Sequence, residues 1–401
     1  MSVDVLFLSR FNAFCGVSTY TEQLATALAN KRVDVGALSS DFKSRGCETD
    51  VPCIVGWSED GELGEALDKI IEINPKIVHI QHEHGIFRST ESLLKLCRAI
   101  KKRTDSSVVM TAHTVPIQAP RPGHDFERLV GSVDAIVVHS EIGAKVVSEY
   151  SSLPKSSRVE FIPHGMLGPV GRIPRDVACK EVGLDPAEHI FRLLSFGFIA
   201  GAKRHMAMIQ VVGAIVSRQM MAPRKLELVI AGRPMDDAKG ILSMMKKSVS
   251  SMNIEHNVRF DAEFVPFERL PYYYGASDMA IHMVDPLNHS ASGSMRTDLS
   301  HGLPIIATRS GMTMDLDGGV YKVGGTDEMM TSLCRIAKSN DILSVLRQQA
   351  VEFTRRNRWS VVAQRHIMLY ERLSGVSLMD KREGIRSALF HSSPWLLGGA
   401  P

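Results

Sequence analysis

Residues 3–30, VDVLFLSRFNAFCGVSTYTEQLATALAN, contain the pattern that decides the fold. Residues 3–8 are almost continuously apolar, as in strands buried on both faces of a parallel sheet. A turn containing Gly16 follows, and residues 18–30 carry apolar side chains at helical spacing. A buried strand, a short turn and an amphipathic helix form the opening unit of a doubly wound α/β domain.

The same alternation continues along the chain and is interrupted once, by the Gly- and Pro-rich residues 165–175, which indicate a linker. In the first half we expect strands at 33–38, 77–81, 108–112, 135–138 and 159–163, and helices at 90–102 and 141–150. In the second half we expect strands at 193–196, 226–231, 258–260, 279–283 and 304–308, and helices at 203–218, 236–251 and 292–301.

These patterns predict two Rossmann-like α/β domains with doubly wound parallel sheets, at 1–168 and 176–358, which suits a length of 401 residues. An amphipathic helix at 360–374 is expected to cross back onto the first domain, and 376–401 to form a tail. Two such domains place the carboxyl ends of their strands across a cleft, where ligands bind.

The composition is that of an ordinary globular protein, with 44% hydrophobic and 23% charged residues, and this excludes disordered and coiled-coil classes. A net charge of +3 is too small to indicate a nucleic-acid partner. The six cysteines include no C-x-x-C pair, and we find no signal peptide or membrane-spanning run, so we expect a cytoplasmic protein. The oligomeric state is left open.

Polar residues gather where the expected strands end. In the second half, Gly197 with Lys203 follows one strand, and Ser292, Gly293 and Ser294 open a helix. A Ser/Gly turn at a helix N-terminus presents amides and hydroxyls to an anion such as phosphate, although Ser292 could simply cap the helix. Lys203 is expected to begin a helix, where a cation opposes the helix dipole unless an anionic ligand lies nearby.

Six motifs occur in order along the chain: CGVSTYT at 15–21, QHEHGIF at 81–87, TAHTV at 111–115, IPHG at 162–165, SFGF at 195–198 with Lys203, and GLPIIAT at 302–308. From about residue 3 to residue 372 the sequence resembles the family-4 retaining nucleotide-sugar glycosyltransferases. The motifs are specific for the superfamily and its fold, not for the donor or the acceptor.

The resemblance implies the GT-B fold, with the nucleotide diphosphate on the C-terminal domain and the acceptor on the N-terminal domain. It implies that Gly16 lends its amide to the diphosphate, that His113 faces the donor sugar, and that Lys203 binds a phosphate as the second catalytic residue. The resulting expectation is a glycosyltransferase without a metal or other cofactor. Its other substrate- or nucleotide-binding residues are Glu83, His84, Gly197, His289, Ser292, Gly293, Ser294 and Asp298.

The sequence departs from the family where two glutamates usually stand, because His289 and Thr297 occupy those positions. Asp298 is one residue away, about 100° around a helix, and could substitute for the second glutamate. The departure motivates an alternative, a catalytically silent protein of this fold that binds a sugar nucleotide or a partner.

Two further hypotheses stay open. His82, His84, His113, His139 and His164 all follow strands, which would suit a metal hydrolase, although this less favoured alternative explains nothing in the second half. The basic helix at 93–103 could rest on anionic lipid and suit a lipid-linked acceptor, or form a solvated face. The acceptor, whether glycan, lipid-linked, protein or small molecule, is not specified by the sequence, nor are the nucleotide and sugar.

Overall fold

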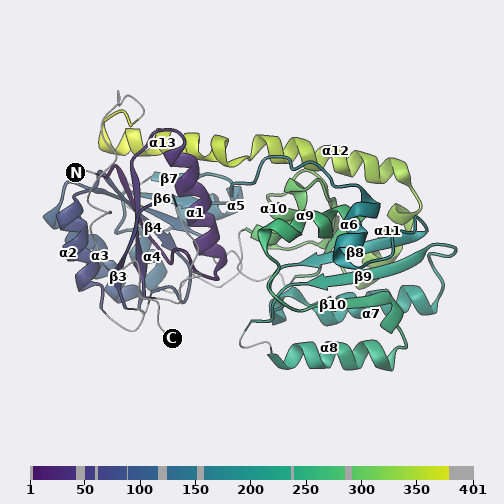
Figure 1. Cartoon of the computed structure of the whole chain (residues 1–401). Helices are drawn as coiled ribbons and strands as arrows, with labels where there is room; N and C mark the ends of the chain where they lie inside the picture. Colours follow the sequence, from purple (N-terminus) through teal and green to yellow (C-terminus); the bar gives the residue numbers. More distant parts are fainter. Residues whose placement is uncertain are drawn as a thin grey trace, which may run out of the picture. The chain divides into compact units, whose positions relative to one another are not determined.

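The structure is a computed structural model that describes residues 3–41, 50–58, 62–87, 89–115, 124–150, 158–235, 239–284 and 291–378. The chain divides into two compact units, Met1–Gly165 with Trp359–Pro401, here called unit 1, and Met166–Arg358, here called unit 2. Each unit contains one parallel sheet covered by helices (Figure 1). The predicted fold class, two parallel-sheet α/β domains, is confirmed.

The sheet of unit 1 has the strand order β3-β2-β1-β4-β5-β6-β7, and all its pairs are parallel. Its strands are β1 (Val5–Leu8), β2 (Val35–Ser40), β3 (Cys53–Trp57), β4 (Ile77–His82), β5 (Ser107–Ala112), β6 (Ala135–Val138) and β7 (Arg158–Phe161). Strand β3 was not predicted. The order reverses between β1 and β4, and such a reversal leaves a crevice at the carboxyl ends of the two strands.

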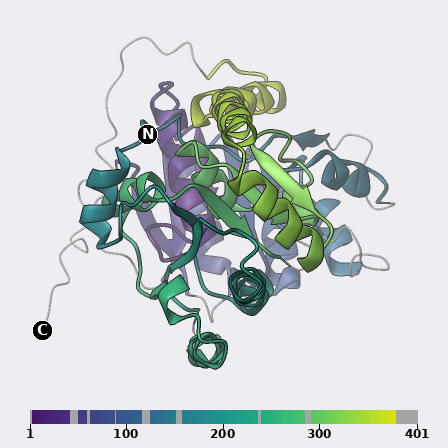
Figure 2. The ribbon, with the colours of Figure 1, turned by 90° about the vertical axis from the view of Figure 1, so that its right-hand side faces the viewer.

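Helices cover both faces of this sheet. They are α1 (Gly16–Ala29), α2 (Gly64–Ile73), α3 (Thr90–Arg103), α4 (His124–Val130), α5 (Glu141–Ser148) and α13 (Trp359–Ser374). Helices α2 to α5 share one apolar core with the sheet. On the other face, α13 (yellow) packs beside α1 (purple), as Figures 1 and 2 both show, and the indole of Trp359 donates to Gln23 Oε1 at 2.7 Å.

The sheet of unit 2 has the order β10-β9-β8-β11-β12-β13, again fully parallel. Its strands are β8 (Ile190–Phe196), β9 (Lys225–Ala231), β10 (Val258–Asp261), β11 (Met279–His282), β12 (Ile305–Thr308) and β13 (Val320–Val323). Here the order reverses between β8 and β11. Strand β13 was not predicted.

The helices of unit 2 are α6 (Arg175–Val182), α7 (His205–Ser217), α8 (Lys239–Ser251), α9 (Leu270–Ala276), α10 (Gly293–Ser300), α11 (Thr326–Ala337) and α12 (Asn340–Arg356). Residues of α7, α8 and α11 form the core on one face of the sheet, and residues of α6, α9 and α10 form the core on the other, while α12 contributes to both. No helix in the described ranges is long and apolar enough to cross a membrane.

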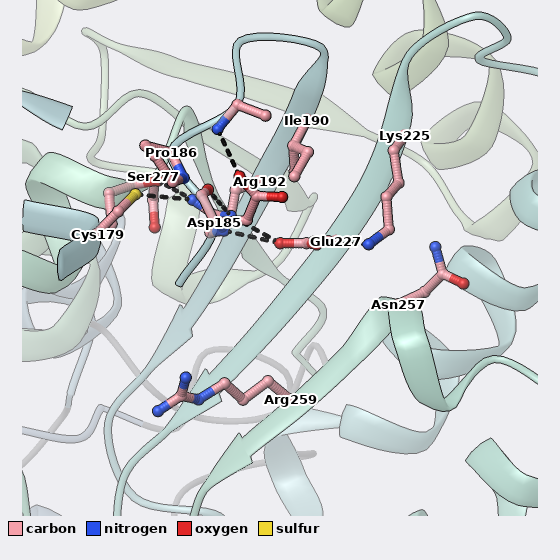
Figure 3. A network of polar contacts seen from close by, with 12 residues as sticks. Cys179, Asp185, Pro186, Ile190, Arg192, Lys225, Glu227, Asn257, Arg259 and Ser277 are labelled. Carbon is pink, nitrogen blue, oxygen red and sulfur yellow. Dashed lines mark hydrogen bonds and ion pairs between the residues drawn. The ribbon is translucent and has the colours of Figure 1, made fainter. Parts of the chain in front are cut away.

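A charged side chain lies at the centre of unit 2. Arg192, in the middle of β8, is fully buried, and its Nη1 donates to Ala276 O at 2.8 Å and to Cys179 Sγ at 3.3 Å. Its Nη2 donates to Asp185 O at 2.7 Å and to Glu227 Oε2 at 2.8 Å (Figure 3). One guanidinium thereby ties β8 to β9, α6, α9 and the loop that precedes β8.

Candidate functional site

The carboxyl ends of β8 and β11 mark the site in unit 2, because ligands of open α/β sheets bind where the strand order reverses. The segment after β8 runs through Gly197 into a single 3₁₀ turn, η1 (Gly201–Lys203). The segment after β11 leads to α10. The expected site residue His289 belongs to it but lies outside the described residues, as do all of 285–290.

Gly197 brings the two segments together. Its φ of +107° is one that other residues rarely adopt, and a Cβ there would lie 2.7 Å from Lys203 Nζ and 3.2 Å from Ser294 Cβ. Lys203 Nζ itself donates to Phe196 O at 3.4 Å. The ammonium group and the N-terminus of α10 therefore flank one backbone position at the end of β8.

The prediction that Lys203 begins a helix is wrong. Lys203 ends η1, Arg204 has a left-handed backbone with φ of +46°, and α7 begins at His205. Lys203 therefore lies outside α7, one residue before its N-cap, and the closeness of Lys203 to Gly197 and Ser294 is the stronger evidence for a role.

Side-chain hydrogen bonds hold the turn at the N-terminus of α10. Ser292 Oγ accepts from Met295 N at 3.4 Å and contacts Ser294 Oγ at 3.2 Å, so Ser292 does cap the helix. Arg296, paired with Asp315, donates from Nη1 to Ser292 O at 3.3 Å and fixes the turn from within. The amides at the start of a helix have no partner inside it, so capping by Ser292 leaves room for an anion at Gly293 and Ser294.

The Lys203 side chain is a cation in a desolvated place. Burial lowers the pKa of Lys203 to about 8, and the nearby Asp298 carboxylate acts in the opposite direction by favouring the charged form. At neutral pH the side chain is thus mostly an ammonium, and a bound anionic ligand would stabilise this charged form further.

Asp298 does not face this opening. Its carboxylate is fully buried, with Oδ1 accepting from Tyr274 OH at 3.0 Å and Oδ2 paired with His282 Nε2 at 2.6 Å. Thr297, where the family's glutamate is expected, donates from Oγ1 to Gly293 O at 2.9 Å. His282 and Tyr274 were not predicted as site residues from the sequence. His282 ends β11, so the strand-end signal that singled out the other histidines applies to it too.

In unit 1 the corresponding strand ends carry Gly16 and Glu83. Gly16 is the exposed first residue of α1, and a Cβ there would meet nothing within 4 Å. Glu83 is half-buried, with Oε2 accepting from Thr114 Oγ1 at 2.7 Å and Oε1 from His84 N at 2.8 Å. A carboxylate is thus held in one orientation beside the exposed His84.

His113 lies just beyond β5, with Nε2 2.9 Å from Gln81 Oε1 and its ring edge-on to Tyr20, 4.7 Å between centroids. Burial, with smaller contributions from His139 and His82, lowers the pKa of His113 well below its ordinary value. The imidazole is therefore neutral at physiological pH. Tyr20, which the sequence analysis did not select, also contacts the rings of His139 and His164.

Two more of the histidines that follow strands make hydrogen bonds to backbone carbonyls. His139 Nδ1 lies 2.9 Å from Ile162 O, and His164 Nδ1 lies 2.6 Å from Gly165 O. Among the residues that the structure describes, no three His, Cys, Asp or Glu side chains are placed to share a metal ion.

No family model matches the chain, and no curated protein matches it by sequence. Solved structures do match in fold. The Anabaena protein Alr3699/HepE in complex with UDP has a TM-score of 0.70 at 14% identity, covering 94% of this chain and 100% of its own. A glycosyltransferase from Rickettsia africae has a TM-score of 0.72 at 13% identity, covering 93% and 98%.

Sucrose-phosphate synthase from Thermosynechococcus elongatus is similar as well, with a TM-score of 0.68 at 16% identity over 92% of this chain and 99% of that one. The chain therefore has the fold of the GT-B glycosyltransferases. HepE was also solved with UDP-glucose.

Proposed function

We propose that the protein is a retaining glycosyltransferase that moves a sugar from a nucleoside-diphosphate sugar to an acceptor. The observation that carries the proposal is the convergence of Lys203, Gly197 and the α10 N-terminus at the strand-order reversal of unit 2. An ammonium and helix amides at one point suit a diphosphate. Because HepE was solved with UDP and UDP-glucose, uridine donors are the first to test.

Cleavage of a sugar–phosphate bond builds positive charge on the sugar and negative charge on the leaving diphosphate. Lys203 and the first amides of α10 stabilise the leaving diphosphate, and no cofactor takes part. The unit 1 residues Gly16, Glu83, His84 and His113 keep the diphosphate- and substrate-binding roles that the family resemblance implies.

A thermal-shift panel of UDP, GDP, ADP and dTDP with their sugar derivatives tests the proposal. A ligand at 100 times its dissociation constant stabilises by about 2.7 kcal/mol, which is easily detected. Slow hydrolysis of a binding donor would distinguish an enzyme from a silent binding protein, and NMR of the transferred sugar's anomeric configuration would test retention. No shift with any nucleotide would refute the proposal.

Gly293→Ala separates ligand binding from stability. Gly293 is exposed at the start of α10 and a Cβ there would meet nothing within 4 Å, so alanine should be neutral or stabilising by up to about 1 kcal/mol. Its methyl group would stand where a phosphate approaches the amides, and we expect calorimetry to show about tenfold weaker diphosphate binding or more. Gly240→Ala, an equally open and exposed helix position in α8, is the matched control and should leave affinity unchanged.

His113→Ala is expected to lower turnover while nearly preserving the affinity for the nucleoside diphosphate, because a neutral imidazole beside the sugar does not contact the phosphates. Turnover and diphosphate affinity are measured separately, with thermal unfolding as the check on folding. An equal loss of both would mean that His113 serves only the structure, through Gln81 and Tyr20.

Contact with an anionic membrane is a second proposal, favoured by a hollow of about 390 Å³ lined by Arg98, Lys101, Lys102 and Arg128, with Gly131 and Ser132. Lys101 pairs with Asp134 at 2.6 Å and Arg128 with Glu91 at 3.2 Å. In the described part of the chain, Arg98 and Lys102 have no acidic partner.

In flotation experiments, binding to vesicles should therefore rise with their phosphatidylglycerol content. Each basic residue near the anionic surface is expected to contribute about 1 kcal/mol to the binding free energy. Lys102→Glu should weaken it, whereas Lys69→Glu, on α2 and paired with Glu72 at 3.0 Å, should not. Equal binding to neutral and anionic vesicles would contradict the membrane proposal.

A further inference from the structure

Four buried polar side chains lie at the ends of β8 and β11 and on the helices beside them, and the proposed transfer uses none of them directly: His205, Tyr274, His282 and Asp298. None is more than 2% exposed. They come from four helices or strands, α7, α9, β11 and α10. We call them the Asp298 cluster. Lys203 Nζ donates to Phe196 O at the end of β8, and His282, which pairs with Asp298, ends the neighbouring strand β11. Asp298 also lies one helical turn after Ser294, which stands beside Lys203 at Gly197.

The contacts of the cluster fix Asp298 and leave it unable to reach a ligand. Both carboxylate oxygens are used inside the protein, one by the Tyr274 hydroxyl at 3.0 Å and the other by His282 Nε2 at 2.6 Å. A carboxylate locked in this way can still act on its neighbours through its charge, and that effect is strong in a desolvated site.

The other titratable groups of the cluster do not supply a negative charge. Burial, Lys203 and His282 together lower the pKa of His205 to about 3, so His205 is neutral. Burial and Asp298 raise the pKa of Tyr274 well above its ordinary value, so its hydroxyl stays protonated and keeps donating. Asp298 is the acidic group that acts on the lysine, and it favours the charged form of a side chain whose burial favours the neutral form.

We propose that Asp298 is a positioning residue that never touches the ligand and instead keeps the half-buried Lys203 side chain an ammonium, ready for a diphosphate. The identity of the anion rests on the proposed function. The effect of Asp298 on the charge of Lys203 does not, and it is measurable without any ligand.

The test is an NMR titration of the ligand-free full chain with ¹³C-labelled lysine, in which Lys203→Arg assigns the Lys203 Cε signal. Asp298→Asn keeps the shape of the side chain and removes its charge. We expect the apparent pKa of Lys203 to fall by about one unit or more, the effect of one charge within about 10 Å at an effective dielectric constant of about 20. An unchanged Lys203 midpoint would overturn the inference.

Two controls separate charge from structure. Asp278→Asn removes another largely buried carboxylate of unit 2, paired with Arg175 at 3.1 Å, and should lower stability without moving the Lys203 midpoint. Tyr274→Phe removes one hydrogen bond of Asp298 but keeps its charge, and should also leave the midpoint in place. If Tyr274→Phe moves it as far as Asp298→Asn does, the effect is structural and the inference fails.

Asp298→Glu and Asp298→Gln differ only in charge at equal length, and they give the same comparison if Asp298→Asn does not fold. A second arm measures the affinities for UDP and inorganic diphosphate from pH 6 to 10. In the wild type, the affinity should fall as pH rises through about 8, since Lys203 then loses its proton. In Asp298→Asn the fall should begin at lower pH. If the wild type binds neither probe, the proposed function fails, while the NMR titration still decides the role of Asp298.

Discussion

Lys203→Ala is expected to lower turnover with a working donor by a factor of about 10²–10³, or about 2.7–4 kcal/mol of transition-state stabilisation. Negative charge on the leaving diphosphate is larger in the transition state than in the bound donor, so the ammonium contributes more to turnover than to donor binding. The partial burial of Lys203 strengthens the interaction because less water screens it than at the surface.

Two variants separate the effect of losing the Lys203 charge from an effect on folding. Lys203→Met keeps most of the side chain that packs by Gly197 and Ser294, and should lose as much turnover as alanine. Arg204→Ala removes the neighbouring cation, which is exposed, and should cost far less. Unchanged turnover in Lys203→Ala would show that the proposed diphosphate site is wrong, whatever the acceptor.

The fold could be predicted because parallel strands buried on both faces are apolar along their whole length. Strands β1, β5 and β6 are of this kind, and nearly every residue in them is buried. Strand β3 (CIVGW) was missed because it lies at the sheet edge, where Val55 is 65% exposed and a glycine interrupts the run. Edge strands have fewer buried residues, so their sequences show a weaker run of apolar side chains.

The candidate site could be predicted only as far as strand ends determine it. Lys203 and Ser292–Ser294 follow β8 and β11, and a parallel sheet brings those ends together whatever lies between them. The partners of Asp298 could not be found in this way, because Tyr274 and His282 lie 24 and 16 residues away and meet it through packing. Helical spacing alone suggested that Asp298 could face the nucleotide, whereas its side chain lies in the core.

Arg192 is a second residue whose environment could not be predicted from the local sequence. A single arginine in the run IFRLLSF would ordinarily be placed on an exposed face, yet it is fully buried. A buried guanidinium persists only if its donors are matched, and here two carbonyls, a thiol and a carboxylate accept from it (Figure 3). No local sequence pattern predicts these partners, because they come from four separate segments.

Arg192→Met is expected to cost about 3–5 kcal/mol of the unfolding free energy of unit 2, the range for breaking a buried ion pair by removing one partner. Methionine fills similar space but leaves the carbonyls of Ala276 and Asp185 without their donor. Glu227 keeps Lys225 at 2.9 Å, so part of its charge stays compensated. Urea unfolding followed by hydrogen exchange of β8 and β9 amides measures the loss.

Arg259→Ala is the matched control on the same sheet, drawn apart from the Arg192 network in Figure 3. Its side chain is 39% exposed and pairs with Asp261 at 2.9 Å, so we expect a cost of about 1 kcal/mol or less. The double variant Arg192→Met with Glu227→Leu should recover stability relative to Arg192→Met, because it also removes the carboxylate that lost its partner. If Arg192→Met costs no more than Arg259→Ala, the buried network does not hold β8 in place. The position of Gly197 and Lys203 at the end of that strand would then need another explanation.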